Sequence, residues 1–167
     1  LYGELEENRA ASVISVLLDL AEDSEAQIKE DPESEELTAV QLPIEFLIST
    51  PGGSADDMFA IYDVMRVVRE RCPVSTYGLG KVMSAGVLIL AAGTKGTRRI
   101  GKHCRVMIHS VIAGSAGSFH NLQNEMSEIK FMQTAYIKAL AAETNMTEAK
   151  LRRMMNKKVN IYLSAEE

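Results

Sequence analysis

The fold is decided by the stretch Gly80-Lys81-Val82-Met83-Ser84-Ala85-Gly86-Val87-Leu88-Ile89-Leu90-Ala91-Ala92-Gly93. A polar run ends at Ser84, and an apolar helical pattern begins directly after it. Serine is a preferred helix N-cap, so we expect Ser84 where a strand turns into a helix. The unpaired N–H groups of such a helix start favour negative charge, so a nucleophile there could leave its oxyanion facing those donors. A simple capped helix would give the same pattern, and this stretch alone leaves both interpretations open.

Composition narrows the class of protein. The 167 residues fit one domain, and 46% apolar with 25% charged residues is ordinary for a globular protein. A net charge of -5 without a basic stripe argues against a nucleic-acid binder. Two cysteines supply neither a disulfide framework nor metal-ligand spacing, which favours a reducing compartment. The longest apolar run is too short to span a bilayer. We therefore expect a soluble, cytoplasmic protein that binds no metal and no cofactor.

Two strand–turn–helix units surround the opening stretch. Residues 44–48 predict a buried strand, followed by a tight turn and a helix from about Ala55. Residues 74–78 predict the next strand, which leads to Ser84 and its helix. Such alternation is typical of an α/β fold with parallel strands and right-handed crossovers.

The flanking sequence predicts further elements. An amphipathic helix is expected from Glu7, and a second, long helix over residues 119–143. Short strands are expected at 97–100 and 105–109, followed later by a helix capped by Thr147, and residues 164–167 indicate the start of another helix. Residues 22–36 hold eight acidic residues and one lysine, which indicates an exposed, partly disordered acidic loop at about 22–37.

A serine nucleophile needs a base within hydrogen-bond reach, and the chain has three histidines. His109 ends an apolar strand, where a side chain projects from the edge of a sheet. His103 lies in a charged turn and His120 opens the long helix, so both are expected at the surface. A structural role for His109 is as consistent with this pattern as a catalytic one. Pro51-Gly52-Gly53 follows a buried strand and would let backbone approach a ligand, although any such unit needs a turn.

Four motifs follow one another over nearly the whole chain: Ser49-Thr50-Pro51-Gly52-Gly53, Met83-Ser84-Ala85-Gly86 with Leu90-Ala91-Ala92-Gly93-Thr94-Lys95-Gly96, Arg105-Val106-Met107-Ile108-His109, and Tyr162-Leu163-Ser164-Ala165-Glu166-Glu167. In this order they resemble the ClpP family, the proteolytic subunits of the Clp protease (peptidase family S14). The resemblance implies an α/β, ClpP/crotonase-like fold of repeated β-β-α units with a protruding handle helix. It also implies a single protease domain over residues 1–167 and a tetradecamer of two stacked heptameric rings around a chamber. Substrates would be fed in by an AAA+ unfoldase of the ClpX, ClpA or ClpC type.

The resemblance assigns roles by position. Ser84 would be the nucleophile, His109 the general base, and the N–H groups of Gly53 and Ala85 the oxyanion hole. Residues 110–143 would form the handle. The positions that would pair with extended substrate are Ser54, Ile112, Ala113, Gly114 and Ser115.

The sequence departs from the family at two places. The acidic member of the family's triad falls on Asn160, and no aspartate follows Asp63. An asparagine can orient a histidine but cannot stabilise the imidazolium with a full charge, and Asp→Asn in a serine-protease triad lowers the rate about 10⁴-fold. Glu125 or Glu128 could substitute, although nothing in their spacing favours them.

At the second place, aromatic docking positions of the family are occupied by Glu45 and Leu47, which makes the unfoldase partner an open question. We therefore expect a serine endopeptidase for unfolded polypeptides with reduced activity. The alternative is a non-catalytic or regulatory ring subunit that co-assembles with an active ClpP. An acyl-CoA hydratase-type relative of the same fold is a third option, which Ser84 and His109 do not favour.

Overall fold

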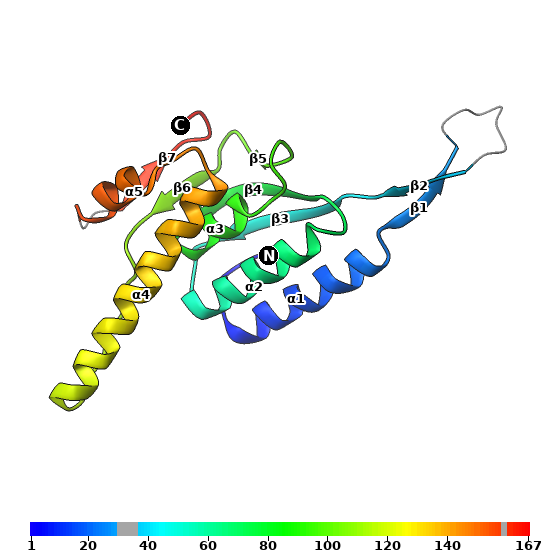
Figure 1. Cartoon of the computed structure of the whole chain (residues 1–167). Helices are drawn as coiled ribbons and strands as arrows, with labels where there is room; N and C mark the ends of the chain where they lie inside the picture. Colours follow the sequence, from blue (N-terminus) through cyan, green and yellow to red (C-terminus); the bar gives the residue numbers. More distant parts are fainter. Residues whose placement is uncertain (30–36, 158–159) are drawn as a thin grey trace.

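The computed structural model describes residues 1–29, 37–157 and 160–167. Its centre is a sheet in the order β3-β4-β6-β7, with β5 also paired to β4 (Figure 1). The strands are β3 (Ile44–Thr50), β4 (Val74–Met83), β5 (Arg99–Ile100), β6 (Arg105–Ile108) and β7 (Ile161–Leu163). β3, β5 and β6 all run parallel to β4, which confirms the predicted parallel α/β arrangement. β7 pairs with β6 in the antiparallel direction, which the sequence did not predict.

Three helices pack beside this sheet: α1 (Glu7–Glu22), α2 (Ala55–Val68) and α3 (Ala85–Ala91). The spacing of Ile61, Met65 and Val68 places them on one face of α2, and all three are buried. α3 is buried on nearly every side, and Gly86 lets it approach β3 because a Cβ there would collide with the side chain of Thr50. The helical part of the stretch 80–93 therefore lies in the core, whereas Gly80 and Lys81 are exposed.

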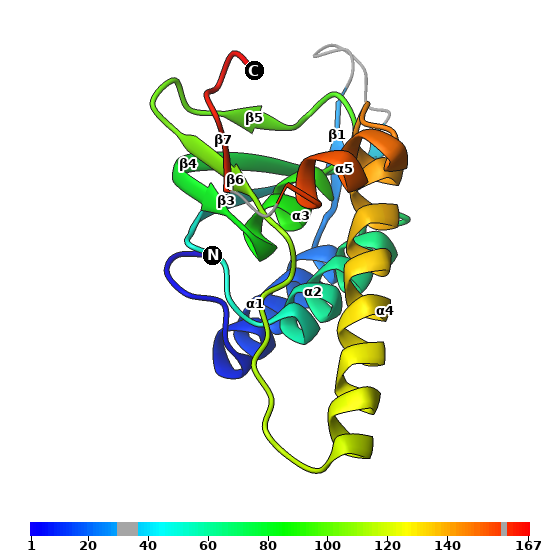
Figure 2. The same cartoon turned by 90° about the vertical axis from the view of Figure 1, so that its left-hand side faces the viewer.

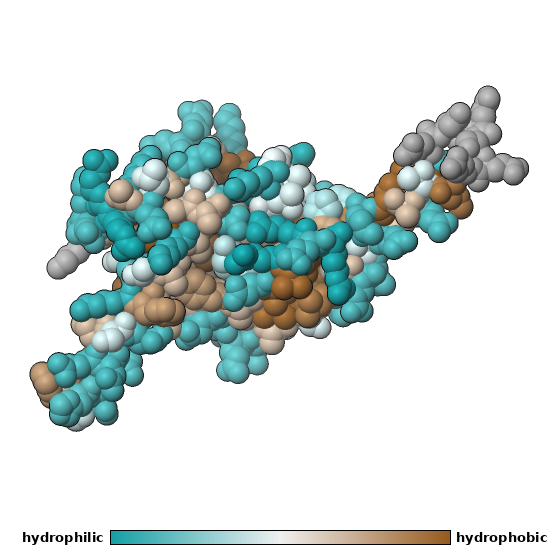
Figure 3. Space-filling model, viewed as in Figure 1, coloured by the Kyte–Doolittle hydropathy of each residue, from teal (hydrophilic) through white to brown (hydrophobic). Residues whose placement is uncertain are grey.

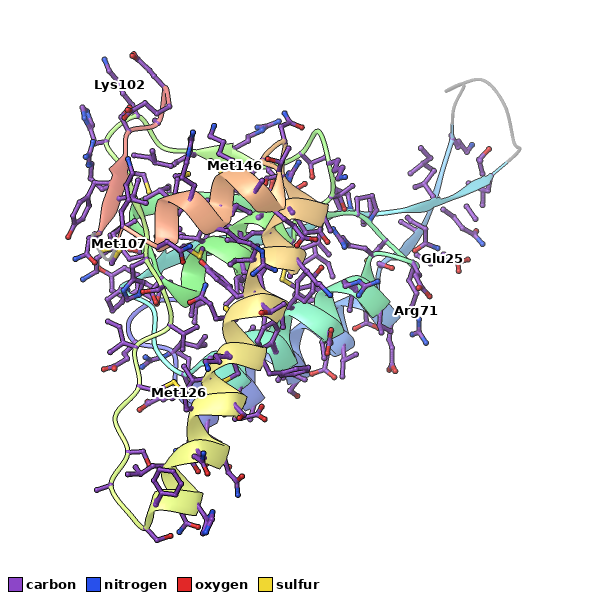
Figure 4. The ribbon with its side chains drawn as sticks, turned by 60° about the vertical axis from the view of Figure 1, so that its left-hand side comes forward. Glu25, Arg71, Lys102, Met107, Met126 and Met146 are labelled. Carbon is purple, nitrogen blue, oxygen red and sulfur yellow. The ribbon has the colours of Figure 1, made fainter. Side chains whose placement is uncertain are left out.

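The fourth helix, α4 (Phe119–Glu143), is half embedded and half free. Its buried residues all lie in its C-terminal third, whereas residues 119–128 are exposed. Figures 1 and 2 show the free half extending away from the body, and Met126 marks it in Figure 4. α5 (Glu148–Met155) then returns the chain to the sheet; the Thr147 Oγ accepts from the Lys150 N–H, as expected for its N-cap.

A buried ion pair fixes the embedded end of α4. Arg69 on α2 donates to both carboxylate oxygens of Glu143 at 2.8 and 3.0 Å, and the Tyr62 hydroxyl donates to one of them at 3.2 Å. Burial alone would raise the pKa of Glu143, but the hydrogen bonds and charge of Arg69 outweigh it and leave that pKa lowered. The carboxylate is therefore charged at neutral pH and binds α4 to α2.

The acidic stretch differs from its prediction as a loop. Residues Glu25–Ile28 form β1, which pairs in the antiparallel direction with β2 (Thr38–Gln41), and residues 30–36 lie outside the described residues. This hairpin projects from the body in Figure 1, and Figure 3 shows apolar surface on it. Ile28, Leu37 and Leu42 are its exposed large apolar residues. The many charges of residues 22–36 favour a loop, and neither strand shows a clear apolar alternation. The sequence therefore does not indicate this strand pair.

Candidate active site

Ser84 occupies a strained position between β4 and α3. Its φ of 54° makes it the one non-glycine residue with positive φ among the residues that the structure describes. Such a conformation costs roughly 1–3 kcal/mol and persists only where surrounding contacts impose it. The predicted location at the helix start is confirmed, but the expected side-chain cap is wrong: the hydroxyl bonds no backbone N–H of α3. The hydroxyl of this strained residue therefore does not cap its own helix.

The Ser84 hydroxyl meets His109 instead. β6 lies beside β4 in parallel register, with Met107 opposite Met83, so the residues that follow both strands are close together. The distance from Ser84 Oγ to His109 Nε2 is 2.6 Å. Partial burial lowers the pKa of His109, which keeps the imidazole neutral near pH 7. With the ring proton on Nδ1, Nε2 is free to accept the serine proton.

His103 and His120 are exposed, as expected, and neither lines the cavity beside Ser84.

The glycine turn after β3 lies against the serine. Gly52 has φ 101°, and a Cβ added to it would come within 2.6 Å of the Ser84 Cβ. A Cβ on Gly53 would overlap the backbone of Leu5, whose N–H donates to the Gly52 carbonyl at 2.8 Å. Both positions therefore require glycine, because backbone approaches them from opposite sides.

Among the residues that the structure describes, two N–H groups near Ser84 have no protein acceptor. Ala85 is the first residue of α3, where a helix offers its N–H no internal partner. Within the described parts of the chain, the Gly53 N–H also meets no acceptor. Gly53, Ser84, Ala85 and His109 all line one cavity of about 40 Å³, which Met58, Phe59 and Met132 complete with apolar side chains.

The predicted third member of the triad does not hold His109. The β6–β7 ladder ends with Ile108 opposite Ile161, and His109 and Asn160 are the next residues beyond it on the two segments. Asn160 is exposed, and across the described residues its side chain makes no hydrogen bond with His109. Glu125 and Glu128 are exposed on the free half of α4 and also make no such contact in this part of the chain.

The positions expected to pair with substrate differ among themselves. Ser54 caps α2: its Oγ accepts from the Asp57 N–H, and its own N–H donates to the Leu5 carbonyl. Its backbone N–H is thus already used within the chain. Ile112, Ala113, Gly114 and Ser115 form an exposed irregular segment that directly follows the base, as an approaching peptide would require. Substrate binding at these five positions stays a prediction.

Two polar side chains of α4 reach the site and were not predicted. The Tyr136 hydroxyl donates to the Ser84 carbonyl at 3.0 Å, and Gln133 Oε1 accepts from the Val111 N–H at 2.7 Å. Tyr136 is spaced with Met132 and Leu140 at helical intervals, which is typical of an apolar stripe. Its sequence position gives no indication of its partner, which lies 52 residues earlier.

Neither a metal centre nor a membrane-spanning helix is found among the described residues. No group of three His, Cys, Asp or Glu side chains in that part of the chain could hold a metal ion. No helix there is long and apolar enough to cross a bilayer.

Comparison with known proteins gives an independent result. The family model described as Clp protease matches residues 35–167. The chain is 32% identical to the ATP-dependent Clp protease proteolytic subunit 4 of Rhodococcus jostii, over 92% of this chain and 70% of that protein. It is also 32% identical to proteolytic subunit 2 of Chlamydia trachomatis, over 98% of this chain and 71% of the relative. The match covers the sheet, the serine turn and the projecting helix alike, and the chain belongs to the Clp protease family.

Proposed function

We propose that this chain is a serine endopeptidase in which Ser84 is the nucleophile and His109 the general base. The 2.6 Å contact between Ser84 Oγ and His109 Nε2 carries this proposal, because it joins two residues that follow neighbouring parallel strands. A serine with a neutral imidazole at this distance is the arrangement that acyl transfer requires. The N–H groups of Gly53 and Ala85 serve as the oxyanion hole, which is supported by the lack of an acceptor for either group within the described parts of the chain.

The reaction follows from these positions. Oγ attacks the carbonyl carbon of a peptide bond while its proton passes to His109 Nε2. The carbonyl oxygen becomes an oxyanion facing Gly53 and Ala85. The C–N bond breaks, and the leaving amine takes the proton from His109, which leaves an acyl-serine. Water then gives a proton to the imidazole, attacks the acyl carbon and releases the new carboxyl end with Ser84 restored.

Asn160 limits the rate of this reaction. An asparagine opposite the imidazole supplies no negative charge to the imidazolium, and its exposure allows water to compete for the ring N–H. We expect activity below that of an enzyme with a carboxylate at this position. The same observation supports the alternative, a ring subunit that contributes structure or regulation beside an active ClpP.

The substrates are unfolded polypeptides cleaved inside an oligomeric chamber. The recess beside Ser84 is small and partly apolar, so it accepts a single side chain rather than a folded surface. Assembly into stacked heptameric rings is supported by the free half of α4, an unsupported helix that exposes Phe119, Leu122 and Met126. Both cysteines are free, which fits a reducing compartment such as the cytoplasm.

An AAA+ unfoldase would deliver these substrates. The relatives' names describe ATP-dependent proteases, which supports a partner of this kind. A cavity of about 390 Å³ next to Leu47 is lined by Tyr2 and Leu79, so apolar docking surface remains although the aromatic residues are replaced.

The test is covalent labelling by a fluorophosphonate together with cleavage of short fluorogenic peptides by the assembled oligomer. We expect labelling of the wild type, none of Ser84→Ala, and strongly slowed labelling of His109→Ala. Ser12→Ala removes an exposed serine hydroxyl on α1 and is the matched control, with wild-type labelling. An assembled wild-type protein that is neither labelled nor active would overturn the proposal.

Mixing with an active ClpP tests the alternative. Mixed rings in native mass spectrometry, together with an unlabelled Ser84, would establish the regulatory subunit. Separate rings would reject it.

A further inference from the structure

The embedded part of α4 touches both segments that carry the reacting side chains. Gln133 and Tyr136 are three residues apart and so lie on one face of the helix. Tyr136 reaches the backbone of Ser84, and Gln133 reaches the backbone two residues after His109. One rigid element therefore contacts the nucleophile's turn and the base's strand end at once. Figures 1 and 2 agree in placing this part of α4 beside α3.

We propose that Tyr136 and Gln133 are positioning residues that hold these two backbone segments at the spacing at which Ser84 and His109 meet. This inference rests on the proposed function, since it explains how that site is kept aligned.

The contact of Tyr136 fits such a role. Its side chain is only 4% exposed, and its hydroxyl donates to a carbonyl that already accepts the Val87 N–H at 3.0 Å. A helix start needs only the bond from the Val87 N–H, so the bond from the Tyr136 hydroxyl is additional. Burial raises the pKa of Tyr136, so the hydroxyl keeps its proton and remains a donor. The extra donor restrains the peptide plane of the residue whose backbone is strained.

Gln133 acts on the other segment. Its Oε1 accepts from the Val111 N–H at 2.7 Å, while its Nε2 lies 2.9 Å from the sulfur of Met155 at the end of α5. The backbone from His109 to Ser118 forms no regular strand, and among the described residues the acceptor of the Val111 N–H is the Gln133 side chain. It fixes the direction in which the base leaves the sheet.

Tyr136→Phe removes one hydroxyl and keeps the buried ring. We expect the labelling rate and kcat to fall about 10- to 100-fold with KM within about twofold, because a misplaced reacting group costs factors of this size. Tyr62→Phe is the matched control: it also removes a hydroxyl that bonds within the structure, to Glu143, but at the far end of α4. We expect it to lower stability and leave kcat unchanged.

Gln133 provides a second, independent pair of variants. Gln133→Leu removes the acceptor for the Val111 N–H and should lower kcat in the same way. Gln133→Glu keeps a carboxylate oxygen as acceptor and should restore most of the rate. Equal losses in both variants would show that an acceptor oxygen at this position does not restore the rate, and would overturn the role of Gln133.

A readout without activity separates this inference from the proposed function. The chain has three histidines, so ¹³C-labelled imidazole signals can be assigned to each. Tyr136→Phe should shift the His109 signals and leave those of His103 unchanged, whereas Tyr62→Phe should shift neither. If the wild type is not labelled, the proposed function fails, and these signals still decide the positioning role. Wild-type His109 signals and rates in Tyr136→Phe, or equal losses in the two Phe variants, would overturn it.

Discussion

Restoring a carboxylate opposite the base is the most informative perturbation of this site. The β6–β7 ladder ends with Ile108 opposite Ile161, and extending it by one residue would set Asn160 opposite His109, where an antiparallel pair has Cβ atoms about 4.5–5.5 Å apart. At that spacing, Asn160→Asp would bring a negative charge to roughly 4–5 Å from the imidazolium that forms during the proposed reaction. The substitution changes a single side-chain group and leaves the size of the residue unchanged.

The exposure of Asn160 sets the size of the effect. Two unit charges 4 Å apart attract by about 1 kcal/mol in water and about 4 kcal/mol near a protein surface. Because position 160 is exposed, we expect the lower part of this range, about 1–2 kcal/mol. This corresponds to a rise of roughly one unit in the pKa of His109 and of about 5- to 30-fold in kcat. The gain stays well below the ~10⁴ associated with a buried triad aspartate.

The assay is the pH dependence of peptide cleavage by assembled wild type and Asn160→Asp. Asn124→Asp adds the same charge on the exposed free half of α4 and serves as the control. We expect the pH-rate profile to show a higher plateau and an acid limb moved to higher pH in Asn160→Asp alone. An unchanged rate and an unchanged acid limb would refute it, as would an equal gain in the control.

Three further predictions follow from described contacts. In Gly53→Ala the added Cβ overlaps the backbone of Leu5, so circular dichroism should show incorrect folding or the peptide assay should show no cleavage. Soluble, fully active protein would contradict this. In the wild type, burial lowers the pKa of His109, so the folded state resists protonation of the imidazole. Both kcat/KM and the free energy of unfolding should therefore rise with pH through a window below 6.5. A pH-rate profile with its midpoint above 6.5 would be inconsistent with burial. Glu143→Ala leaves Arg69 without its partner and should cost about 3 kcal/mol in urea unfolding, while a loss under 1 kcal/mol would show that the pair contributes little.

The elements that the sequence predicted well are those with strong local patterns. β3, α2, β6 and α4 follow from apolar runs, apolar periodicity and turn residues, and their bounds lie close to those expected. β4 extends five residues beyond its predicted end, up to Ser84, because its second half is held by β6 and carries no strong strand signal. The hairpin of β1 and β2 was missed because both strands are short and the sequence between and before them is strongly acidic.

The site was predictable in its residues but not in its geometry. Ser84 stood out because serine suits a helix start, yet its side chain does not cap α3, and the strain that directs it to His109 leaves no trace in the sequence. The sequence does not single out Tyr136, since an aromatic residue on the apolar stripe of a helix is usually a core residue. Its hydroxyl acquires a role only when α4 meets α3, a contact between distant parts of the chain that local periodicity cannot encode.

The contacts around Ser84 join segments that are far apart in the sequence. The Gly52 carbonyl accepts from the N–H of Leu5, and the Tyr136 hydroxyl reaches the Ser84 carbonyl from 52 residues later. The proposed active site would therefore stay incomplete during synthesis until α4 has left the ribosome and packed against α3, so a partly made protein should not label with a fluorophosphonate.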